Sequence, residues 1–470
     1  MRLASLLGPD IKQILKEDPD ELRALLDQLH AEDLADIISE LEPDEAALLL
    51  SRLPAEDAAP IFERLEDHEQ EELLKEMAPE SVAHIASEMA PDDRADLFSM
   101  MPEAAGEQLL ETLQKMDPAA AEEVREIEKW PEMSAGHMMT TRYVSVTEAM
   151  TVKQTMAEVR KRAKEKGEFV YVAYALAAGE KLQGVISLRD ILVAEPDQKV
   201  SEIMTTNVIS VLPTTDREDA ARKMAKYDLN AMPVVDDRGR LLGVITIDDV
   251  VDVLVREQTE DVQKIGGIEP LDVPYFQTTF LTFIRKRAVW LIVLFVEEFF
   301  TQTALRHYDP VMEAVKGALL YVPLLISAGG NSGSQSSTLI IRGLSIGEIK
   351  LSDWWRILIR ECGMGVVLGL IIACIAMGRV MMYPEQHFPF ALTVGITVLF
   401  IIITGCMVGS MLPLIMKRLR IDPATSSTPF IASLVDTLGV IIYAHVAMAV
   451  MHDVIEKAAA AGAAAAAVTP

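Results

Sequence analysis

One carboxylate, Asp436, stands in the middle of the last strongly apolar stretch of the chain, Pro429–Tyr443. An aspartate near the centre of a membrane helix costs about 2.5–3.5 kcal/mol, so such residues usually face a water-filled path or a partner. Carboxylate oxygens are also ligands that hard cations accept. The sequence therefore predicts that Asp436 lines a path for a cation through a membrane.

A second set of carboxylates lies on a segment that reads as one helix from Asp248 to Ile265, ended by two glycines. At about 100° per residue, five acids cover one half of this helix and an apolar stripe covers the other. The five acids are Asp249, Asp252, Glu257, Glu260 and Asp261. Oxygen-only clusters suit hard divalent cations such as Mg²⁺ or Ca²⁺. A solvated helix face is the ordinary alternative.

The membrane domain that must position Asp436 is predicted at residues 288–456, which hold five apolar segments long enough to cross a bilayer. They are residues 288–306, 314–341, 357–380, 388–416 and 428–452. Most of the Lys and Arg residues around these segments fall on one side of the membrane, so the positive-inside rule places the N-terminus in the cytosol and the C-terminus outside. We expect a multi-pass protein of the cell (inner) membrane.

Polar residues interrupt two of these segments. The second segment contains Gly329–Gln335, a stretch rich in Gly, Ser and Asn that would not face lipid. It either lines a cavity with polar or irregular backbone or packs tightly against another helix through its small residues. Glu297 and Glu298 in the first segment are also costly, and we expect one of them to face the interior.

The negative charge of the chain is concentrated in its first segment. Residues 1–130 hold 11 Lys and Arg against 35 Asp and Glu, a net charge of −24 of the total −28. This balance argues against nucleic acid as a partner and favours cations or a basic surface. The three cysteines show no metal-ligand spacing and imply no disulfide framework. An Ala-rich tail at 457–470 carries no assigned function.

The acidic segment, residues 1–130, is a helical repeat. Apolar residues recur every 12 positions at Leu29, Leu41, Leu53, Leu65, Met77, Met89, Met101 and Leu113. Proline follows one or two positions later in most copies, with acids after it, which is a helix-start signature. We expect short helices stacked into a small superhelix that serves as a regulatory domain.

Two copies of one α/β module follow, at 134–199 and 200–256. Met138–Val146 resembles Ile203–Val211, and each copy later runs into a β-rich segment. The doubled pattern resembles a pair of CBS domains, a regulatory module that in many cases binds adenine nucleotides. By that resemblance ATP is a possible ligand, with its ribose held by Ser187, Asp190, Thr246 and Asp249. The alternative is that each Ser or Thr caps the helix that follows it.

The whole constellation resembles the MgtE family of magnesium transport proteins. The resemblance rests on Gly329–Gln335, on Asp422–Asp436, on the CBS pair and on the acidic Asp248–Asp261 segment. It implies a multidomain fold: a superhelical N domain, an α/β CBS pair, a plug or connecting helix at 250–287 and an all-α transmembrane domain of five helices. It also implies a homodimer with the pore at the subunit interface.

Residue roles carried over from the family complete the expectation. Asp436 matches the pore aspartate, and Asn331 falls in the signature of the second span. Asp249, Asp252, Glu257, Glu260 and Asp261 match positions that hold regulatory Mg²⁺, joined by Asp216, Glu218 and Asp228 from the second CBS module. Asp92, Asp93 and Asp96 are candidates from the helical repeat.

The resemblance implies a channel or transporter that takes up Mg²⁺ and closes when Mg²⁺ binds its cytosolic acids. Two alternatives remain: a channel for another divalent ion such as Co²⁺ or Mn²⁺, and a CBS-containing membrane sensor without transport. An enzyme is not expected, because His445 lacks a partner at recognisable spacing.

Overall fold

The computed structural model describes residues 29–164, 171–271, 273, 275–315, 317–384 and 387–466. The chain divides into two compact units, Met1–Arg256 and Glu257–Pro470. The division falls inside one helix, α15 (Ile247–Ile265), so the acidic residues of this helix belong partly to each unit. Each unit is described below by itself.

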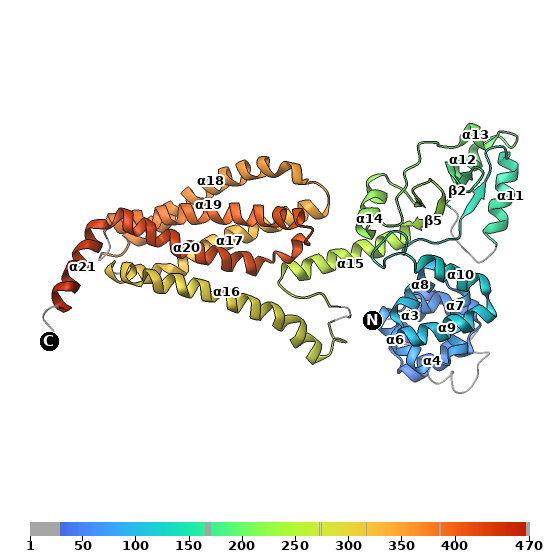
Figure 1. The fold of residues 1–470 in the computed structure, drawn as a ribbon, viewed down its shortest axis with the longest axis horizontal. Helices are drawn as coiled ribbons and strands as arrows, with labels where there is room; N and C mark the ends of the chain where they lie inside the picture. Colours follow the sequence, from blue (N-terminus) through green and yellow to red (C-terminus); the bar gives the residue numbers. More distant parts are fainter. Residues whose placement is uncertain are drawn as a thin grey trace. The chain divides into compact units, whose positions relative to one another are not determined.

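Short helices build the first part of unit 1 (Figure 1). They are α3 (Ala31–Ile38), α4 (Pro43–Arg52), α5 (Ala55–Phe62), α6 (Asp67–Glu76), α7 (Pro79–Glu88), α8 (Pro91–Met100), α9 (Glu103–Met116) and α10 (Pro118–Ile127). Several begin with proline at the first helical position, where its missing N–H has no partner to lose. The predicted repeat of short helices is confirmed here; residues 1–28 of it lie outside the described residues.

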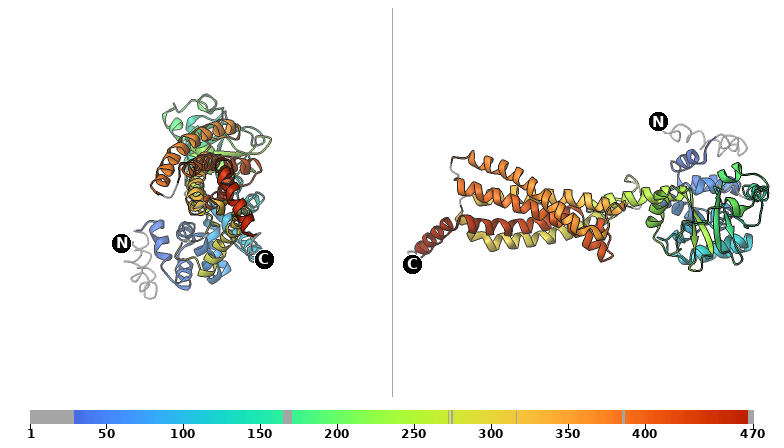
Figure 2. Two further views of the ribbon diagram at one scale, coloured as in Figure 1. Left: turned by 90° about the vertical axis from the view of Figure 1, so that its left-hand side faces the viewer. Right: turned by 90° about the horizontal axis from the view of Figure 1, so that it is seen from above.

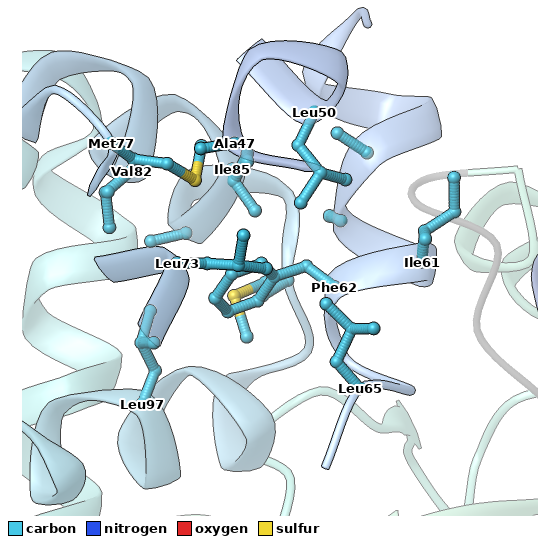
Figure 3. Close-up of a cluster of buried hydrophobic side chains, with 14 of the residues drawn as sticks. Ala47, Leu50, Ile61, Phe62, Leu65, Leu73, Met77, Val82, Ile85 and Leu97 are labelled. Carbon is cyan, nitrogen blue, oxygen red and sulfur yellow. The ribbon is translucent and has the colours of Figure 1, made fainter. Parts of the chain in front are cut away.

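Five of the repeat residues, Leu41, Leu65, Met77, Met89 and Leu113, are buried in the core of this domain, together with apolar residues from other positions of the helices. Phe62, Leu73 and Leu97 meet between neighbouring helices, and each is at most 3% exposed (Figure 3). Full burial of such a side chain contributes about 1.5–3 kcal/mol. A helix of 8 to 10 residues is marginal alone, so this shared core is what holds the short helices in place.

The two α/β modules complete unit 1. The first holds β1 (Val144–Val146), α11 (Val152–Arg162), β2 (Val172–Leu176), β3 (Leu182–Ser187) and α12 (Leu188–Val193); the second holds α13 (Val200–Ile203), α14 (Arg217–Lys226), β4 (Ala231–Val235) and β5 (Leu241–Thr246). In each, an antiparallel strand pair leads directly into a helix. The internal duplication predicted from the sequence is thus present in the fold.

Long helices dominate unit 2. They are α16 (Phe280–Ala314), α17 (Ala318–Ser345), α18 (Trp354–Met381), α19 (Phe388–Arg418) and α20 (Thr428–Val450), followed by α21 (His452–Ala466), with the short 3-10 turns η1 (Leu351–Asp353) and η2 (Pro423–Thr425). The long helices lie side by side (Figure 2). In the described residues, four segments are long and apolar enough to cross a membrane: Phe280–Ala314, Leu351–Met381, Phe388–Arg418 and Thr428–Val450.

The helix α17 lies outside that set, because its interior carries the polar Gly329–Gln335 stretch. Four of the five predicted membrane spans are therefore long and apolar enough to cross a membrane. The span at α17 stays a prediction. The backbone of Gly329–Gln335 is regular helix.

Close packing explains the glycines of α17. A side-chain carbon added at Gly329 would lie 2.3 Å from Ile401 Cγ2 of α19, and one added at Gly409 would lie 2.1 Å from the carbonyl oxygen of Gly333. The two backbones touch, which is the geometry that small residues allow in membrane helices. The tight-packing alternative for this stretch is the one that the structure supports.

Candidate pore and regulatory cation sites

Asp436 lies on α20 with a half-buried side chain, next to the glycine stretch of α17. A carbon added at Gly330 would lie 3.5 Å from Asp436 Oδ1, so the glycine faces the carboxylate with no side chain of its own between them. Asn331, the other predicted pore residue, is exposed and lies within 3.5 Å of Ser327 Oγ through its amide nitrogen. Among the described residues, no hydrogen bond joins Asn331 to Asp436.

The helix α16 brings a second carboxylate towards Asp436. Ser433, one turn before Asp436, donates a 3.3 Å hydrogen bond to Glu298 Oε1. One turn further on, the hydroxyls of Thr301 and Thr437 are 2.8 Å apart. The negative charges of Glu298 and Asp436 are close enough to interact. Glu298 therefore contacts α20, the helix that carries Asp436, which the sequence alone did not indicate.

The neighbouring carboxylate, Glu297, is half-buried, and its Oε2 atom has no hydrogen-bond partner among the described residues. The sequence led us to expect one of the two glutamates to face the interior. Glu297 is the more buried of the two, whereas Glu298 is exposed and contacts a side chain of α20.

The structure also places a carboxylate that sequence reasoning missed. Glu361 of α18 is 5% exposed and accepts a 2.6 Å hydrogen bond from Ser336 of α17. Its signal was present in the sequence, because Glu361 is an acid in an apolar segment. The contact links α18 to the polar stretch of α17.

A distinct set of carboxylates gathers in unit 1, where the helical domain meets the second α/β module. We call it the acidic group: Glu63, Asp92, Asp93, Asp96, Asp248 and Asp249. The fold brings the predicted Asp92, Asp93, Asp96 and Asp249 together, although Asp96 and Asp249 lie far apart in the sequence. Glu63 is the member that the sequence did not indicate.

Electrostatics show how crowded these acids are. Burial, and then repulsion from Asp93, raises the pKa of Asp92 well above its usual range. Burial and the neighbouring Glu63 and Asp249 do the same for Asp93. Burial and Asp92 raise the pKa of Asp249, against the opposing effect of a hydrogen bond from Thr246. Such a group is relieved by a proton or by a bound cation.

The acidic group fits a hydrated divalent ion better than a closed protein cage. Asp92 Oδ1 is buried and has no hydrogen-bond partner in the described part of the chain, so it could act as a cation ligand. Yet across the described ranges no three His, Cys, Asp or Glu side chains are arranged to hold a metal ion by themselves. Mg²⁺ typically keeps several waters and takes one or two carboxylates, so this donor set is compatible with it.

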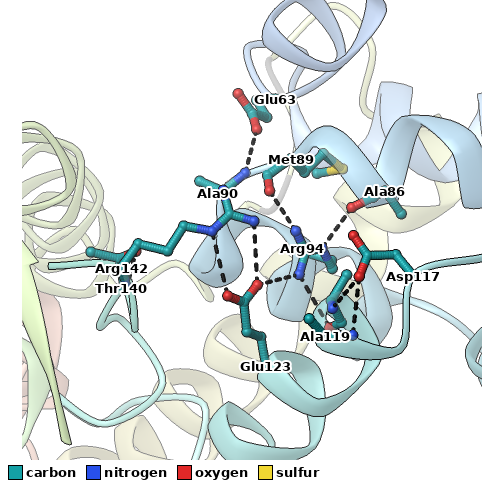
Figure 4. Close-up of polar contacts among 11 residues, drawn as sticks. Glu63, Ala86, Met89, Ala90, Arg94, Asp117, Ala119, Glu123, Thr140 and Arg142 are labelled. Carbon is teal, nitrogen blue, oxygen red and sulfur yellow. Dashed lines mark hydrogen bonds and ion pairs between the residues drawn. The ribbon is translucent and has the colours of Figure 1, made fainter. Parts of the chain in front are cut away.

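A buried arginine positions α8, the helix that carries three members of the acidic group (Figure 4). The guanidinium of Arg94 is fully buried and donates to the carbonyls of Ala86, Met89 and Ala120 at 2.6–3.1 Å. It also pairs with Glu123 at 2.8 Å. The network fixes α8 between α7 and α10.

The same network reaches the start of the α/β modules. Arg142 pairs with Glu123 at 3.3 Å, so one carboxylate serves two arginines (Figure 4). His137, which is 4% exposed, places Nε2 3.1 Å from Asp96 Oδ1. Sequence reasoning missed His137, since a lone histidine in a connecting segment gives no signal of its own.

The remaining candidates of unit 1 lie apart from any described cation-binding arrangement. Asp216 caps α14 by accepting hydrogen bonds from the N–H groups of Glu218 and Asp219. Glu218 also forms a salt bridge with Arg222. Asp228 is exposed in a left-handed conformation with φ 52°, and Asp252 is exposed on α15. Their roles as metal ligands stay predictions.

The acids at the end of α15 belong to unit 2 and contact its helices there. Asp261 accepts a 2.7 Å hydrogen bond from Ser345 at the end of α17. Glu260 forms a salt bridge with Lys264, and Lys264 also contacts Asp422. Glu257 is half-buried. Gly267, with φ 71°, ends the helix as predicted.

The nucleotide candidates are engaged in local hydrogen bonds. Ser187 caps α12 by accepting from the Asp190 N–H at 3.1 Å, and its hydroxyl donates to Asp190 Oδ2 at 2.6 Å. Thr246 donates to Asp249 Oδ2 at 2.5 Å. The Ser187 contact matches the capping alternative. Thr246 instead donates to Asp249, which also belongs to the acidic group.

Comparison with known proteins fits this geometry. An MgtE intracellular N domain profile matches residues 29–133, CBS domain profiles match 135–197 and 200–256, and the MgtE divalent cation transporter profile matches 322–446. The magnesium transporter MgtE of Thermus thermophilus is 40% identical over 339 residues, which are 72% of this chain and 75% of that protein. The chain belongs to the MgtE family.

Further relatives agree with that membership. The magnesium transporter MgtE of Bacillus subtilis is 31% identical over 341 residues, 73% of this chain and 75% of that protein. A crystal structure of the soluble part of a magnesium transporter covers 54% of this chain and 99% of its own, at 31% identity and a TM-score of 0.50. As an MgtE-family protein with long apolar helices, the chain is a multi-pass membrane protein.

Proposed function

We propose that this protein is a channel or transporter that carries Mg²⁺ across the cell membrane. The observation that carries the proposal is Asp436, a carboxylate in the middle of an apolar helix that lies against the bare backbone of Gly330 and near the charge of Glu298. Its MgtE-family relatives are named magnesium transporters. Mg²⁺ sheds water reluctantly, so Asp436 would hold the ion through retained water and release it readily.

The proposal extends to regulation. The acidic group and the acids of α15 are the residues that would hold regulatory Mg²⁺: like charges crowd together in the acidic group, and the α15 acids share one face of the helix that leads towards the membrane helices. Bound Mg²⁺ would favour a closed state by differential binding. Swinging such an equilibrium from 1:99 to 99:1 needs about 5.5 kcal/mol, which several weak sites together can supply.

Assembly, orientation and nucleotide binding are further parts of the proposal. We propose a homodimer with two copies of Asp436 facing one path, with the N-terminus in the cytosol and the C-terminus outside. ATP at the CBS pair would require Ser187 to exchange its capping hydrogen bond, or Thr246 its hydrogen bond to Asp249, for the nucleotide.

Reconstitution into liposomes tests the transport. We expect Mg²⁺ influx from the natural sequence and none from Asp436→Ala, with an unchanged thermal unfolding curve for the folded variant. Adding Co²⁺ or Mn²⁺ as a competing ion distinguishes a channel for another divalent cation. Full Mg²⁺ flux in Asp436→Ala would refute the pore assignment, and no flux of any divalent ion would favour the sensor alternative.

A further inference from the structure

Lys264, on the last turn of α15, stands between two carboxylates of unit 2. Its ammonium forms a salt bridge with Glu260 on the same helix and lies 2.7 Å from Asp422 Oδ2, 158 residues further along the chain. Burial lowers the pKa of Lys264, but the contacts with Asp422 and Glu260 outweigh that effect and raise it. The lysine is therefore a fixed positive charge in this contact.

Asp422 is itself held rigidly. Its Oδ1 accepts a hydrogen bond of 2.9 Å from the Ala424 N–H, which leaves Oδ2 directed at Lys264. The backbone carbonyl of Asp422 accepts a 2.5 Å hydrogen bond from the Thr425 hydroxyl. These bonds shape η2, the turn directly before the pore helix α20. A displacement of Asp422 would therefore also move the turn that leads into α20.

Neighbouring contacts dock the same end of α15. Ser345 donates to Asp261 at 2.7 Å, and a carbon added at Gly267 would lie 3.4 Å from Ser427 Oγ. Ser427 is fully buried and caps α20 through the Phe430 N–H. Asp436 follows eight residues into that helix, about 12 Å along its axis. The docked end of α15 therefore touches both the residue that starts α20 and the turn before it.

Two carboxylates that face each other are ordinarily a place for a divalent cation, because the pair repels itself until a positive charge intervenes. Here the intervening charge is supplied by the chain. An ammonium group has three donors and needs no free ion in solution. Lys264 can therefore keep the end of α15 docked on the α20 connection when the concentration of Mg²⁺ is low.

We propose that Lys264 is a built-in cation that fills the Glu260–Asp422 carboxylate pair and makes the docking of α15 on the start of α20 independent of Mg²⁺ at that point. The contact itself does not depend on the proposed function. If Mg²⁺ does close the protein as proposed, it would then act through the acidic group and the acids of α15 other than Glu260. Removing Lys264 empties the pair, so docking there becomes dependent on a divalent ion.

Disulfide trapping in the full-length protein tests the proposal without measuring ion flux, so its outcome is separate from that of the transport assay. Gly267→Cys and Ser427→Cys place two Cβ atoms at a separation that a disulfide accepts, since the added carbon lies 3.6 Å from Ser427 Cβ. Cys362, Cys374 and Cys406 are first replaced by Ala. The rate of oxidative cross-linking is then compared with chelator and with Mg²⁺ alone.

With Lys264 present, we expect fast cross-linking in both conditions. With Lys264→Gln, we expect cross-linking about fivefold slower in chelator, the effect of losing a partly buried ion pair, and recovery when Mg²⁺ is added. Lys264→Arg should retain most of the original rate. Arg256→Gln, which removes a positive charge from the same helix, is the matched control and should change nothing, because Arg256 pairs with Asp67.

Two results would overturn the proposal. If the Lys264→Gln variant cross-links at the original rate in chelator, the ammonium group does not hold α15 against the start of α20. Lys264→Gln that stays slow with Mg²⁺ would show that no divalent ion takes the place of the lysine. Because Gly267 has φ 71°, a cysteine there is strained; alkylation of Ser427→Cys alone, buried in the docked state, gives the same comparison without that substitution.

Discussion

Gly330 of α17 and Asp436 of α20 are in contact across the helix interface, with the position of an added Gly330 side-chain carbon 3.5 Å from Asp436 Oδ1 and 3.2 Å from Ala432 Cβ. The first distance is an ordinary contact, and the second is tight. A methyl group therefore fits with a small adjustment but occupies the space beside the carboxylate that an ion or its water would use.

Gly330→Ala should consequently reduce Mg²⁺ flux in liposomes several-fold while changing the free energy of unfolding by less than about 1.5 kcal/mol. Gly378→Ala on α18, where an added carbon meets nothing within 4 Å, is the control and should conduct normally. Normal flux in Gly330→Ala would mean that the ion path does not pass this face of Asp436.

Sequence periodicity could predict the elements but not their partners. The 12-residue repeat with its prolines gave the short helices of the first domain, and the acidic and apolar halves gave α15 with its glycine end. The period of a segment fixes which side chains share a face, and not which face of another element it meets. Ser433 with Glu298, and Lys264 with Asp422, lie 135 and 158 residues apart. Such pairs appear only once the helices are packed.

The polar stretch of α17 shows the same limit in another form. Gly329–Gln335 fits both a cavity lining and a tight helix contact by composition, because the same small residues serve both. The contact between Gly329 and Ile401 shows that one face of the stretch packs tightly against α19, whereas Gly330 faces Asp436. Part of the acidic group could be predicted, because Asp92, Asp93 and Asp96 lie within one turn or so of the same helix. Glu63 comes close to them only because the helices of the repeat stack.

Glu298→Gln should weaken the attraction of the pore for divalent cations. The substitution keeps a hydrogen-bond acceptor for Ser433 and removes a negative charge near Asp436. If the charge of Glu298 attracts the ion by about 1 kcal/mol, its loss corresponds to about a fivefold higher Mg²⁺ concentration for half-maximal flux. Liposome flux at a series of Mg²⁺ concentrations measures it.

Thr303→Val on the same helix is the control for Glu298→Gln, since Thr303 is exposed and its hydroxyl donates to the backbone carbonyl of Phe299. An unchanged half-maximal concentration in Glu298→Gln would show that the charge of Glu298 does not reach the transported ion.

Arg94→Met should destabilise unit 1 strongly. Methionine has a similar length but leaves the carbonyls of Ala86, Met89 and Ala120 without their donor and Glu123 with one arginine fewer. Removing one partner of a buried ion pair costs about 3–5 kcal/mol. Calorimetry of the full-length protein should show a lower melting temperature for the first unit. Arg125→Met, at an exposed salt bridge with Glu122, should change it by at most about 1 kcal/mol.

Gly409→Ala tests the contact between α17 and α19. The added carbon would lie 2.1 Å from the carbonyl oxygen of Gly333, so the two helices must separate, at a cost of about 1–3 kcal/mol. Thermal unfolding in detergent should show this loss. Gly363→Ala on α18 is the control, because nothing lies within 4 Å of its added carbon. Equal stability of the two variants would contradict the close approach of the helices.

The acidic group should make the stability of unit 1 depend on both pH and Mg²⁺. The pKa values of Asp92, Asp93 and Asp249 are raised in the folded state, chiefly by burial and then by neighbouring carboxylates. Between the ordinary pKa and the raised one, the folded state binds more protons than the unfolded state, so the free energy of unfolding falls as the pH rises through that range. Without divalent ions, the first unit should melt at a higher temperature as the pH falls from neutral towards the ordinary pKa of an aspartate.

Added Mg²⁺ should have the same stabilising effect at neutral pH, because a bound cation relieves the same repulsion, and the gain should grow with its concentration. Asp93→Asn should raise the melting temperature in chelator and reduce the responses to pH and to Mg²⁺ together, since both act on one set of charges. Glu111→Gln, an exposed acid of the same domain, should leave both responses intact. A variant Asp93→Asn that lost the pH response and kept the full Mg²⁺ response would place the regulatory ion elsewhere on unit 1.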